Sequence, residues 1–421
     1  MAPIIGRIVQ TSPYLDSGSP AARKLLTALF IGVFMSALDT AIIGPAIPAL
    51  RAAFAVDNRQ ISLVTVIFVL GSMPSTALMA NLSDRHGRRP IYLACVAAFA
   101  LGSLLIALST SFWMVLVGRA IQGIGAGGLM PTASAIIGDT FAPEQRGRVL
   151  GLVGATYGMA FVIGPPLATV LMLVASWHWI FLLNLPIAAA VLYFASRVLP
   201  TRRHQEALPP LDSTGILALF ALLIALVLGI TRTLDPFIGL HLWPWLLAAA
   251  LLLLALLVHL ERRAAQPVVP LQLFANRQLA TTYLLTAGAG FGMGAIAFLT
   301  SIATLAHGVA NQQSGFALLP LVVCSMFGSM ASGRRLNVDG PRKLIVTGFA
   351  LLTVGYGGSA LLQWGLWGFL LSSVPVGIGV GILVGGALRA IAIEEAPAAL
   401  RGAAQGLINL CLLYTSDAAD E

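Results

Sequence analysis

Long apolar segments follow one another along almost the whole chain of 421 residues. A helix rises about 1.5 Å per residue, so about 20 apolar residues are needed to cross the ~30 Å hydrocarbon layer of a bilayer. Charged residues make up only 10% of this chain, whereas soluble domains carry about 25%. The sequence therefore predicts an all-helical, multi-pass membrane protein in which little of the chain forms a soluble domain.

The apolar runs predict about twelve complete membrane helices and a partial thirteenth that begins near Gly402. The first six are expected at residues 25–47, 61–80, 90–108, 113–137, 149–174 and 179–199. The next six are expected at residues 214–231, 243–259, 279–303, 314–332, 343–363 and 367–390.

The polar stretch from Leu199 to Pro210 marks a boundary between two helix bundles. We expect a cytosolic tail at residues 1–24 and a six-helix bundle at 25–200. A linker and two inserted helices are expected at 201–265, followed by an incomplete bundle at 266–413.

Arginine and lysine residues gather in alternate loops between the apolar runs. The loops on the side of the N-terminus hold all but four of the 24. The exceptions are Arg51, Arg59 and Arg232 in the opposite loops and Arg119 inside a span. Because cytoplasmic loops carry the excess of basic residues, we expect a cytoplasmic N-terminus, in a plasma or bacterial inner membrane. The basic stretches lack interleaved aromatic residues, so nucleic acid is not an expected partner.

A carboxylate, Asp39, lies near the middle of the first span, and Gly44, Pro45 and Pro48 follow it. Placing a charge at that depth costs at least ~2.5–3.5 kcal/mol, so such residues usually face a polar cavity. Proline removes a backbone donor and bends the helix. A titratable group beside a bendable helix suits a proton-coupled carrier. The alternative is a structural pairing of Asp39 with another buried polar group.

The fourth span contains Arg119 and Gln122, followed by a glycine-rich run at residues 123–128. An arginine near a carboxylate favours its charged form and competes with the proton. The alternative for Arg119 is snorkelling to an interface. The glycine run matches a dinucleotide-binding fingerprint, but it lies inside a span with no preceding strand. These glycines are instead expected to allow close packing of helices.

The loop between the second and third spans reads Ala80-Asn-Leu-Ser-Asp-Arg-His-Gly-Arg-Arg89. From composition alone it is either an orienting basic loop or a set of ion pairs that holds one mouth of a carrier shut. Its glycine permits a tight turn. Its candidate functional residues are Asp84, Arg85, Gly87, Arg88 and Arg89.

This loop resembles the signature Gly-x-Leu-x-Asp-Arg-x-Gly-Arg-Arg of the major facilitator superfamily, with Ala80 in place of the first glycine. The resemblance implies a major facilitator fold and a cytoplasmic gate that includes Asp84 and Arg88. Arg119 and Gln122, with Gly123, resemble the fourth-span motif of the same family, which is linked there to proton coupling.

The fifth span resembles the antiporter motif of exporters in this family through Gly151, Gly158, Gly164 and Pro165. The match is partial, because other glycines of the motif are replaced. The replacing residues are Ala160, Ala168 and Thr169.

Two further stretches, Leu38–Thr40 and Trp177–Pro186, resemble the fourteen-span drug:proton antiporters, with His178 in place of the usual arginine. The second stretch contains Asn184, which is expected to hydrogen-bond across helices or to contact substrate. The spans at 214–231 and 243–259 fit the two extra helices of that group.

The resemblance implies proton-driven efflux of drugs or other small amphipathic compounds by alternating access, without a cofactor, a metal or enzyme activity. Asp39 would carry the proton or meet a cationic substrate, and Arg119 would tune it. We expect a monomer whose partners are a small-molecule substrate, protons and the lipid bilayer. The alternatives are a carrier selective for one metabolite, in either direction, and a non-transporting sensor. A membrane enzyme would need clustered catalytic side chains near one interface, and we find none in the sequence.

The apolar run that begins near Gly402 ends at about Leu413, and the acidic stretch Tyr414–Glu421 follows it. That run is too short to cross a bilayer. We therefore expect a C-terminally truncated fourteen-span protein with a foreign tail at residues 414–421, which inserts into a membrane but does not transport.

Overall fold

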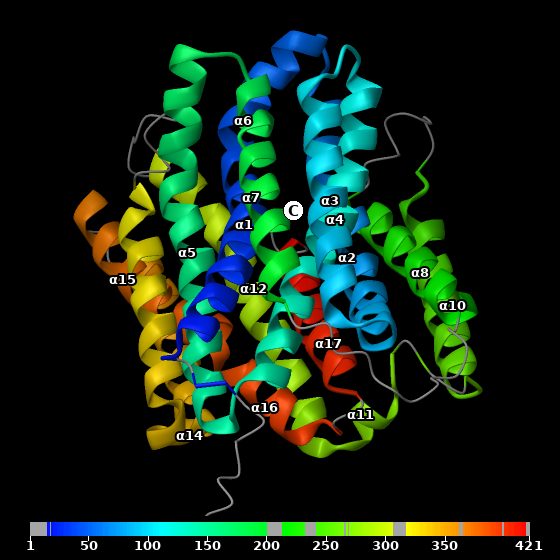
Figure 1. Cartoon of the computed structure of the whole chain (residues 1–421). Helices are drawn as coiled ribbons and strands as arrows, with labels where there is room; N and C mark the ends of the chain where they lie inside the picture. Colours follow the sequence, from blue (N-terminus) through cyan, green and yellow to red (C-terminus); the bar gives the residue numbers. More distant parts are fainter. Residues whose placement is uncertain are drawn as a thin grey trace, which may run out of the picture.

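The computed structural model describes residues 15–16, 18–199, 213–231, 241–264, 267, 269–305, 317–361, 365–397 and 400–417. Within these residues the regular elements are all helices (Figure 1). Ten of the described helical segments are long and apolar enough to cross a membrane. The predicted all-helical, multi-pass architecture is therefore confirmed.

The N-terminal bundle consists of seven helices, because the sixth expected span is divided at Leu183. They are α1 (Pro20–Phe54), α2 (Asn58–His86), α3 (Arg88–Ala107), α4 (Phe112–Thr140), α5 (Pro143–Val174), α6 (His178–Leu182) and α7 (Asn184–Val198). In this bundle α4 packs against α2 and α3, and α1 packs against α5 and α7.

Polar side chains fix where several of these helices begin. The Asp57 side chain accepts a hydrogen bond from the backbone N–H of Gln60 at 2.7 Å, and the backbone N–H of Asp57 donates to Gln60 Oε1 at 3.1 Å, forming a capping box. Ser19 and Ser111 are the N-cap residues of α1 and α4, and each side chain accepts from a backbone N–H in the first turn of its helix. Each cap satisfies a backbone donor that the helix leaves free.

Two inserted helices, α8 (Ser213–Thr231) and α10 (Trp243–Glu261), follow the N-terminal bundle. They pack against each other and, through α8, against α2, forming a cluster that includes Met73. Figure 1 shows the pair at one side of the molecule. Part of the expected linker, residues 200–212, lies outside the described residues.

The C-terminal bundle follows the inserted pair. It consists of α11 (Gln272–Ala275), α12 (Arg277–Leu305), α14 (Leu319–Leu361), α15 (Gly365–Ile382), the π-helical segment η2 (Leu383–Ala387), α16 (Leu388–Glu395) and α17 (Arg401–Asp417). Two of these elements differ from expectation. Gly340, at φ 76°, interrupts α14 and separates the two spans expected there. Helix α17 continues to Asp417, beyond the expected end at Leu413.

Apart from Ile393 of α16, which joins the N-terminal core, the two bundles have separate apolar cores. They meet mainly along two helix pairs. Helix α5 of the N-terminal bundle packs on α14, and α17 of the C-terminal bundle packs on α2. Both contacts lie toward the end of the molecule at which α1, α3 and α5 begin, where most arginines lie. We call this the basic end.

An internal repeat, which we did not identify from the sequence, relates these two contacts. Helix α5 contains Arg146-Gly147 followed by Gly151, and α17 contains Arg401-Gly402 followed by Gly406. Each arginine donates from Nε to a carbonyl at the end of the preceding helix, at 3.0 and 3.1 Å. Gly151 faces Gly333 of α14, and Gly406 faces Ala80 of α2.

The turns beside Gly333 and Ala80 are also alike. Gly87 and Gly340 each adopt positive φ, at 94° and 76°, which is a conformation that favours glycine. The spacing from Ala80 to Gly87 equals that from Gly333 to Gly340. The basic end is thus built twice, once from each bundle.

Candidate functional site

Asp39 lies at the centre of a buried polar network in the N-terminal bundle, and only 1% of its surface is exposed. Its Oδ2 accepts a hydrogen bond from Arg119 Nη1 at 2.7 Å. Its Oδ1 accepts from Gln122 Nε2 at 2.7 Å and from Asn184 Nδ2 at 2.9 Å. Residues from α1, α4 and α7 therefore meet at one carboxylate.

Arg119 is held on several sides. Besides its bond to Asp39, it donates from Nε to the Val64 carbonyl of α2 at 3.0 Å and from Nη1 to Gln122 Oε1 at 2.7 Å. Its guanidinium lies 4.2 Å from the centre of the Phe68 ring, a distance at which a cation and a ring attract. Arg119 is 1% exposed, so it forms a buried pair with Asp39 instead of snorkelling to an interface.

Ser103 of α3 completes the network. Its hydroxyl accepts from Gln122 Nε2 at 2.9 Å and from Asn184 Nδ2 at 3.2 Å, and it donates to the Phe99 carbonyl at 3.0 Å. We call Asp39, Ser103, Arg119, Gln122 and Asn184 the Asp39 network. The three side chains that contact the Asp39 carboxylate all donate to it. The arrangement therefore fits a charged carboxylate, because a protonated one would need an acceptor.

The glycine-rich run of α4 packs closely, as predicted. A Cβ atom at Gly123 would lie 2.3 Å from the Phe68 carbonyl oxygen of α2, and one at Gly125 would lie 2.5 Å from the Cys95 carbonyl oxygen of α3. The small residues bring α2, α3 and α4 together beside the network.

The loop between α2 and α3 lies at the basic end. Arg88 donates to Asp84, to Ser83 Oγ at 2.8 Å and, from Nε, to Asp139 Oδ2 at the end of α4 at 3.0 Å. These bonds tie the loop to its own bundle.

The remaining loop arginines also have partners in the N-terminal bundle. Arg89 donates to the Ser196 carbonyl near the end of α7, and Arg85 donates to Asn81 Oδ1 at 3.1 Å. The positive φ of Gly87 confirms the predicted tight turn. The gating role of the loop stays a prediction.

Helix α5 presents its glycines to two partners. A Cβ atom at Gly158 would lie 3.5 Å from Ser325 Oγ of α14, and one at Gly164 would lie 2.6 Å from the Ala41 Cβ of α1. Ser329 Oγ of α14 donates to the Gly151 carbonyl at 2.9 Å across the bundle contact. The side chain of Pro165 lies outside the described residues.

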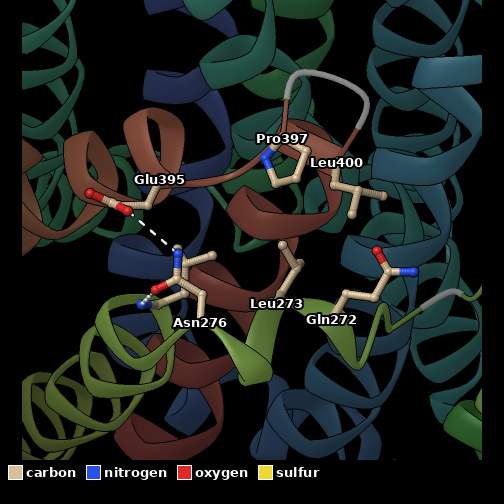
Figure 2. A pocket seen from close by; sticks show the side chains of 7 residues that line it. Gln272, Leu273, Asn276, Glu395, Pro397 and Leu400 are labelled. Carbon is tan, nitrogen blue, oxygen red and sulfur yellow. Dashed lines mark hydrogen bonds between the residues drawn. The ribbon is translucent and has the colours of Figure 1, made fainter.

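A pocket of about 130 Å³ lies at the junction of α11, α12, α16 and α17 (Figure 2). Figure 2 shows Asn276 and Glu395 pointing toward each other, and Asn276 Nδ2 donates to Glu395 Oε2 at 3.4 Å. Asn276 Oδ1 also caps α12 by accepting from the backbone of Gln278 at 2.9 Å. Ligand pockets usually have about 300–1,000 Å³, so this pocket is too small for a drug-sized compound. The contact between Asn276 and Glu395 instead joins the start of α12 to the end of α16.

Two residues of these sites, Ser103 and Asp139, were not singled out from the sequence, and neither was the buried Arg389 of α16. Ser103 is a serine in an apolar span, where most serines bond only to their own helix. Asp139 lies at the end of a span, where a charge needs no special explanation. Arg389 lies near the end of its span and was counted with the basic loops, yet it is only 4% exposed.

Comparison with known proteins places these features in a family. A family model described as Major Facilitator Superfamily matches residues 29–413. The Uncharacterized MFS-type transporter YfiU of Bacillus subtilis (strain 168) is 33% identical over 400 residues, which cover 92% of this chain and 77% of that protein. The Tetracenomycin C resistance and export protein of Streptomyces glaucescens is 30% identical over 392 residues, covering 91% and 71%.

The fold is similar to that of a solved proton:xylose symporter, XylE, with a TM-score of 0.69 and 14% sequence identity over 94% of this chain and 87% of that one. This chain spans between 50% and 77% of the length of the curated relatives compared. The match of the family model over most of the chain, together with this fold, shows that the chain belongs to the major facilitator superfamily.

Proposed function

We propose that this transporter exports drugs or other small amphipathic compounds in exchange for protons. The observation that carries the proposal is the buried Asp39 carboxylate, which faces three donors and lies in a membrane span. An ionisable group inside a membrane segment is a functional candidate by default, because the cost of burying it must be offset.

The donor arrangement supplies a coupling step. A proton on Asp39 removes the negative charge that pairs with Arg119. It also adds an O–H donor that faces the N–H donors of Arg119, Gln122 and Asn184. The hydrogen bonds from α1 to α4 and α7 therefore weaken. Proton binding and the intact Asp39 network therefore exclude each other. A movement of α1 against α4 and α7 would follow the protonation state of Asp39.

The bundle contacts suit alternating access, in which two halves rock about a central site. In this structure α5 meets α14 and α17 meets α2 toward the basic end. If the basic end faces the cytoplasm, as the arginine distribution predicts, this state is closed on the cytoplasmic side. The loop arginines beside Asp84 and Asp139 would then form and break contacts as that side opens.

The names of relatives favour export. One relative is named for resistance to and export of tetracenomycin C, and others carry the words multidrug or efflux pump. The inserted pair α8 and α10 between the bundles favours membership of the fourteen-span group. A monomer in the cell membrane, with its N-terminus in the cytoplasm, completes the proposal.

Flux into proteoliposomes tests the proposal. The purified chain is reconstituted with an acidic lumen and neutral exterior, and uptake of radiolabelled tetracenomycin C, the compound in the name of one relative, is followed with and without nigericin, which collapses the pH gradient. This proposal replaces the sequence-based expectation of a chain that inserts without transporting, so uptake that stops with nigericin is expected. Equal uptake under both conditions would overturn proton coupling.

The direction and breadth of transport need a cellular test. Cells that produce the chain are exposed to several structurally unrelated toxic compounds. Increased resistance to more than one is expected. Resistance or sensitivity confined to a single compound would favour a selective carrier instead.

A further inference from the structure

Arg389 of α16 is a second buried arginine, and the Asp39 network does not use it. It is 4% exposed, and its Nε and Nη1 atoms have no hydrogen-bond partner in the part of the chain that the structure describes. Two acids follow it on the same helix, but Glu394 is exposed and Glu395 accepts from Asn276. A buried cation without a partner is destabilising unless a ligand or another conformation supplies one.

Arg389 lies where α16 crosses the N-terminal bundle. One turn before it, a Cβ atom at Gly154 of α5 would lie 2.8 Å from Gly385 Cα. One turn after it, Ile393 belongs to the apolar core of the N-terminal bundle. The arginine is therefore enclosed between the bundles at a contact that must open for transport.

Helix α17, which bonds to the backbone of Arg389, also carries unpartnered polar atoms. Gln405 Nε2 donates to the Arg389 carbonyl at 2.9 Å, which leaves the Gln405 Oε1 acceptor buried without a partner among the described residues. Asn409 follows one turn later, and its Nδ2 donor is unpartnered in the same way. Buried polar atoms are paired in the great majority of cases, so three such side chains on neighbouring helices indicate a site for a polar group.

We propose that Arg389 binds the carboxylate of an amphipathic substrate, with Gln405 and Asn409 contacting its adjacent polar groups. The charges favour an anion, because Asp39 and Arg119 neutralise each other and Arg389 adds a positive charge. A guanidinium presents parallel donors that match a carboxylate. The site becomes accessible when the bundles separate at the basic end. This inference rests on the proposed transport function and names its substrate class.

Equilibrium binding tests the site without a gradient. The purified full chain in an uncharged detergent is titrated with 1-naphthoate, 1-naphthalenemethanol and 1-naphthylmethylammonium, which share a ring and differ in head-group charge. We expect naphthoate to bind about tenfold more tightly than the alcohol, the size expected for a charge-assisted hydrogen bond. The ammonium compound is expected to bind most weakly. Equal affinities for the three probes would overturn the proposal.

Variants test whether a preference for naphthoate over the alcohol depends on Arg389. Arg389→Gln should reduce naphthoate affinity to that of the alcohol while leaving alcohol binding unchanged, and Arg389→Lys should keep part of the preference. The control is Arg263→Gln, which removes the same charge from an exposed position and should change nothing. A preference that survives in folded Arg389→Gln would overturn the assignment. If that variant does not fold, loss of the preference in Gln405→Leu supports the site and its retention overturns it.

The outcome is separable from proton coupling. The binding assay on the unchanged chain contains no gradient, so the preference for naphthoate that it measures does not depend on proton coupling. Failure of gradient-driven flux with this preference intact would overturn the exporter proposal alone.

Discussion

Asp39 and Arg119, which are 80 positions apart in the chain, form an ion pair of 2.7 Å in which both side chains are buried. Removing one partner of such a pair leaves an uncompensated buried charge, at a cost of about 3–5 kcal/mol. In the intact protein, Gln122 and Asn184 also donate to the carboxylate and offset part of the cost of burying its charge. The pair is therefore both a structural link between α1 and α4 and the group most able to respond to a proton.

The first prediction concerns coupling. Asp39→Asn keeps the size and polarity of the side chain but removes its titratable charge, so transport driven by a pH gradient should fall at least about tenfold, a barrier change of about 1.4 kcal/mol. Uptake into proteoliposomes measures this. Asp339→Asn, which changes an acid of the loop that follows Gly333, is the control. Full gradient-driven uptake by monodisperse Asp39→Asn protein would refute the proton role.

The second prediction concerns the stability of the Asp39 network. Ser103→Ala removes an acceptor that Gln122 and Asn184 share. The loss of a buried hydrogen bond should lower the free energy of unfolding by about 0.5–1.5 kcal/mol. Unfolding in mixed micelles measures it. Ser359→Ala is the matched control, because that hydroxyl bonds to Tyr356 of its own helix. A Ser103 variant no less stable than the control would contradict this account.

Several members of the Asp39 network could be identified from the sequence because polar residues stand out in apolar spans. Asp39 was noted on span one, Arg119 and Gln122 together on span four, and Asn184 on span six, with contact between Arg119 and Asp39 left open. Their convergence could not be predicted, since it depends on how far each helix is rotated about its own axis. Helix rotation is set by packing, such as the contact of Gly123 with α2, and no local pattern encodes it.

The same limit explains what was missed elsewhere. The expected spans overlap the described helices, ten of which are long and apolar enough to cross a membrane, because hydrophobic length is a local property. From the sequence, Arg389 is assigned to the basic loops because it lies near the end of a span. Only the packing of α16 against the N-terminal bundle shows that it is enclosed. The repeat that relates Arg146 to Arg401 has few identical residues, so it emerges only when both helices are seen to make equivalent contacts.

The third prediction concerns the gate. Arg88→Ala removes the bonds that tie the loop to Asp84 and Asp139. Charge-assisted hydrogen bonds contribute about 1.5–3 kcal/mol, so the maximal transport rate should fall about tenfold or more if these bonds form during gating. The substrate concentration at half-maximal rate should change little, because the bonds of Arg88 include no residue of the Asp39 network. Initial rates over a range of substrate concentrations measure both quantities.

The control for the gate is Arg335→Ala, since Arg335 has an exposed side chain in the equivalent loop of the C-terminal bundle. Its kinetics should resemble those of the unchanged protein. A variant at Arg88 with an unchanged maximal rate and a large loss of affinity would show that the loop acts on binding and not on gating.

The last prediction concerns the contact between the bundles. A Cβ atom at Gly154 would lie 2.4 Å from Ser329 Oγ and 2.8 Å from Gly385 Cα. The serine hydroxyl can rotate away, but the backbone of η2 cannot, so Gly154→Val should keep α5 from closing on the C-terminal bundle. Overpacking of this kind costs about 1–3 kcal/mol, which shifts a two-state equilibrium about 5- to 150-fold.

Electron–electron distances between spin labels measure that shift. Labels at Arg148 and Arg335, both exposed at the basic end, should report a longer distance in Gly154→Val than in the unchanged background. Gly357→Val is the matched control, because a Cβ atom at Gly357 meets nothing within 4 Å, and its distance distribution should be unchanged. If Gly154→Val gave the same distribution as its control, the contact between α5 and η2 would not set the closed state. A longer distance would instead show that this close approach holds the basic end shut, and Arg389, one turn along from Gly385, would then open to solvent in the same movement.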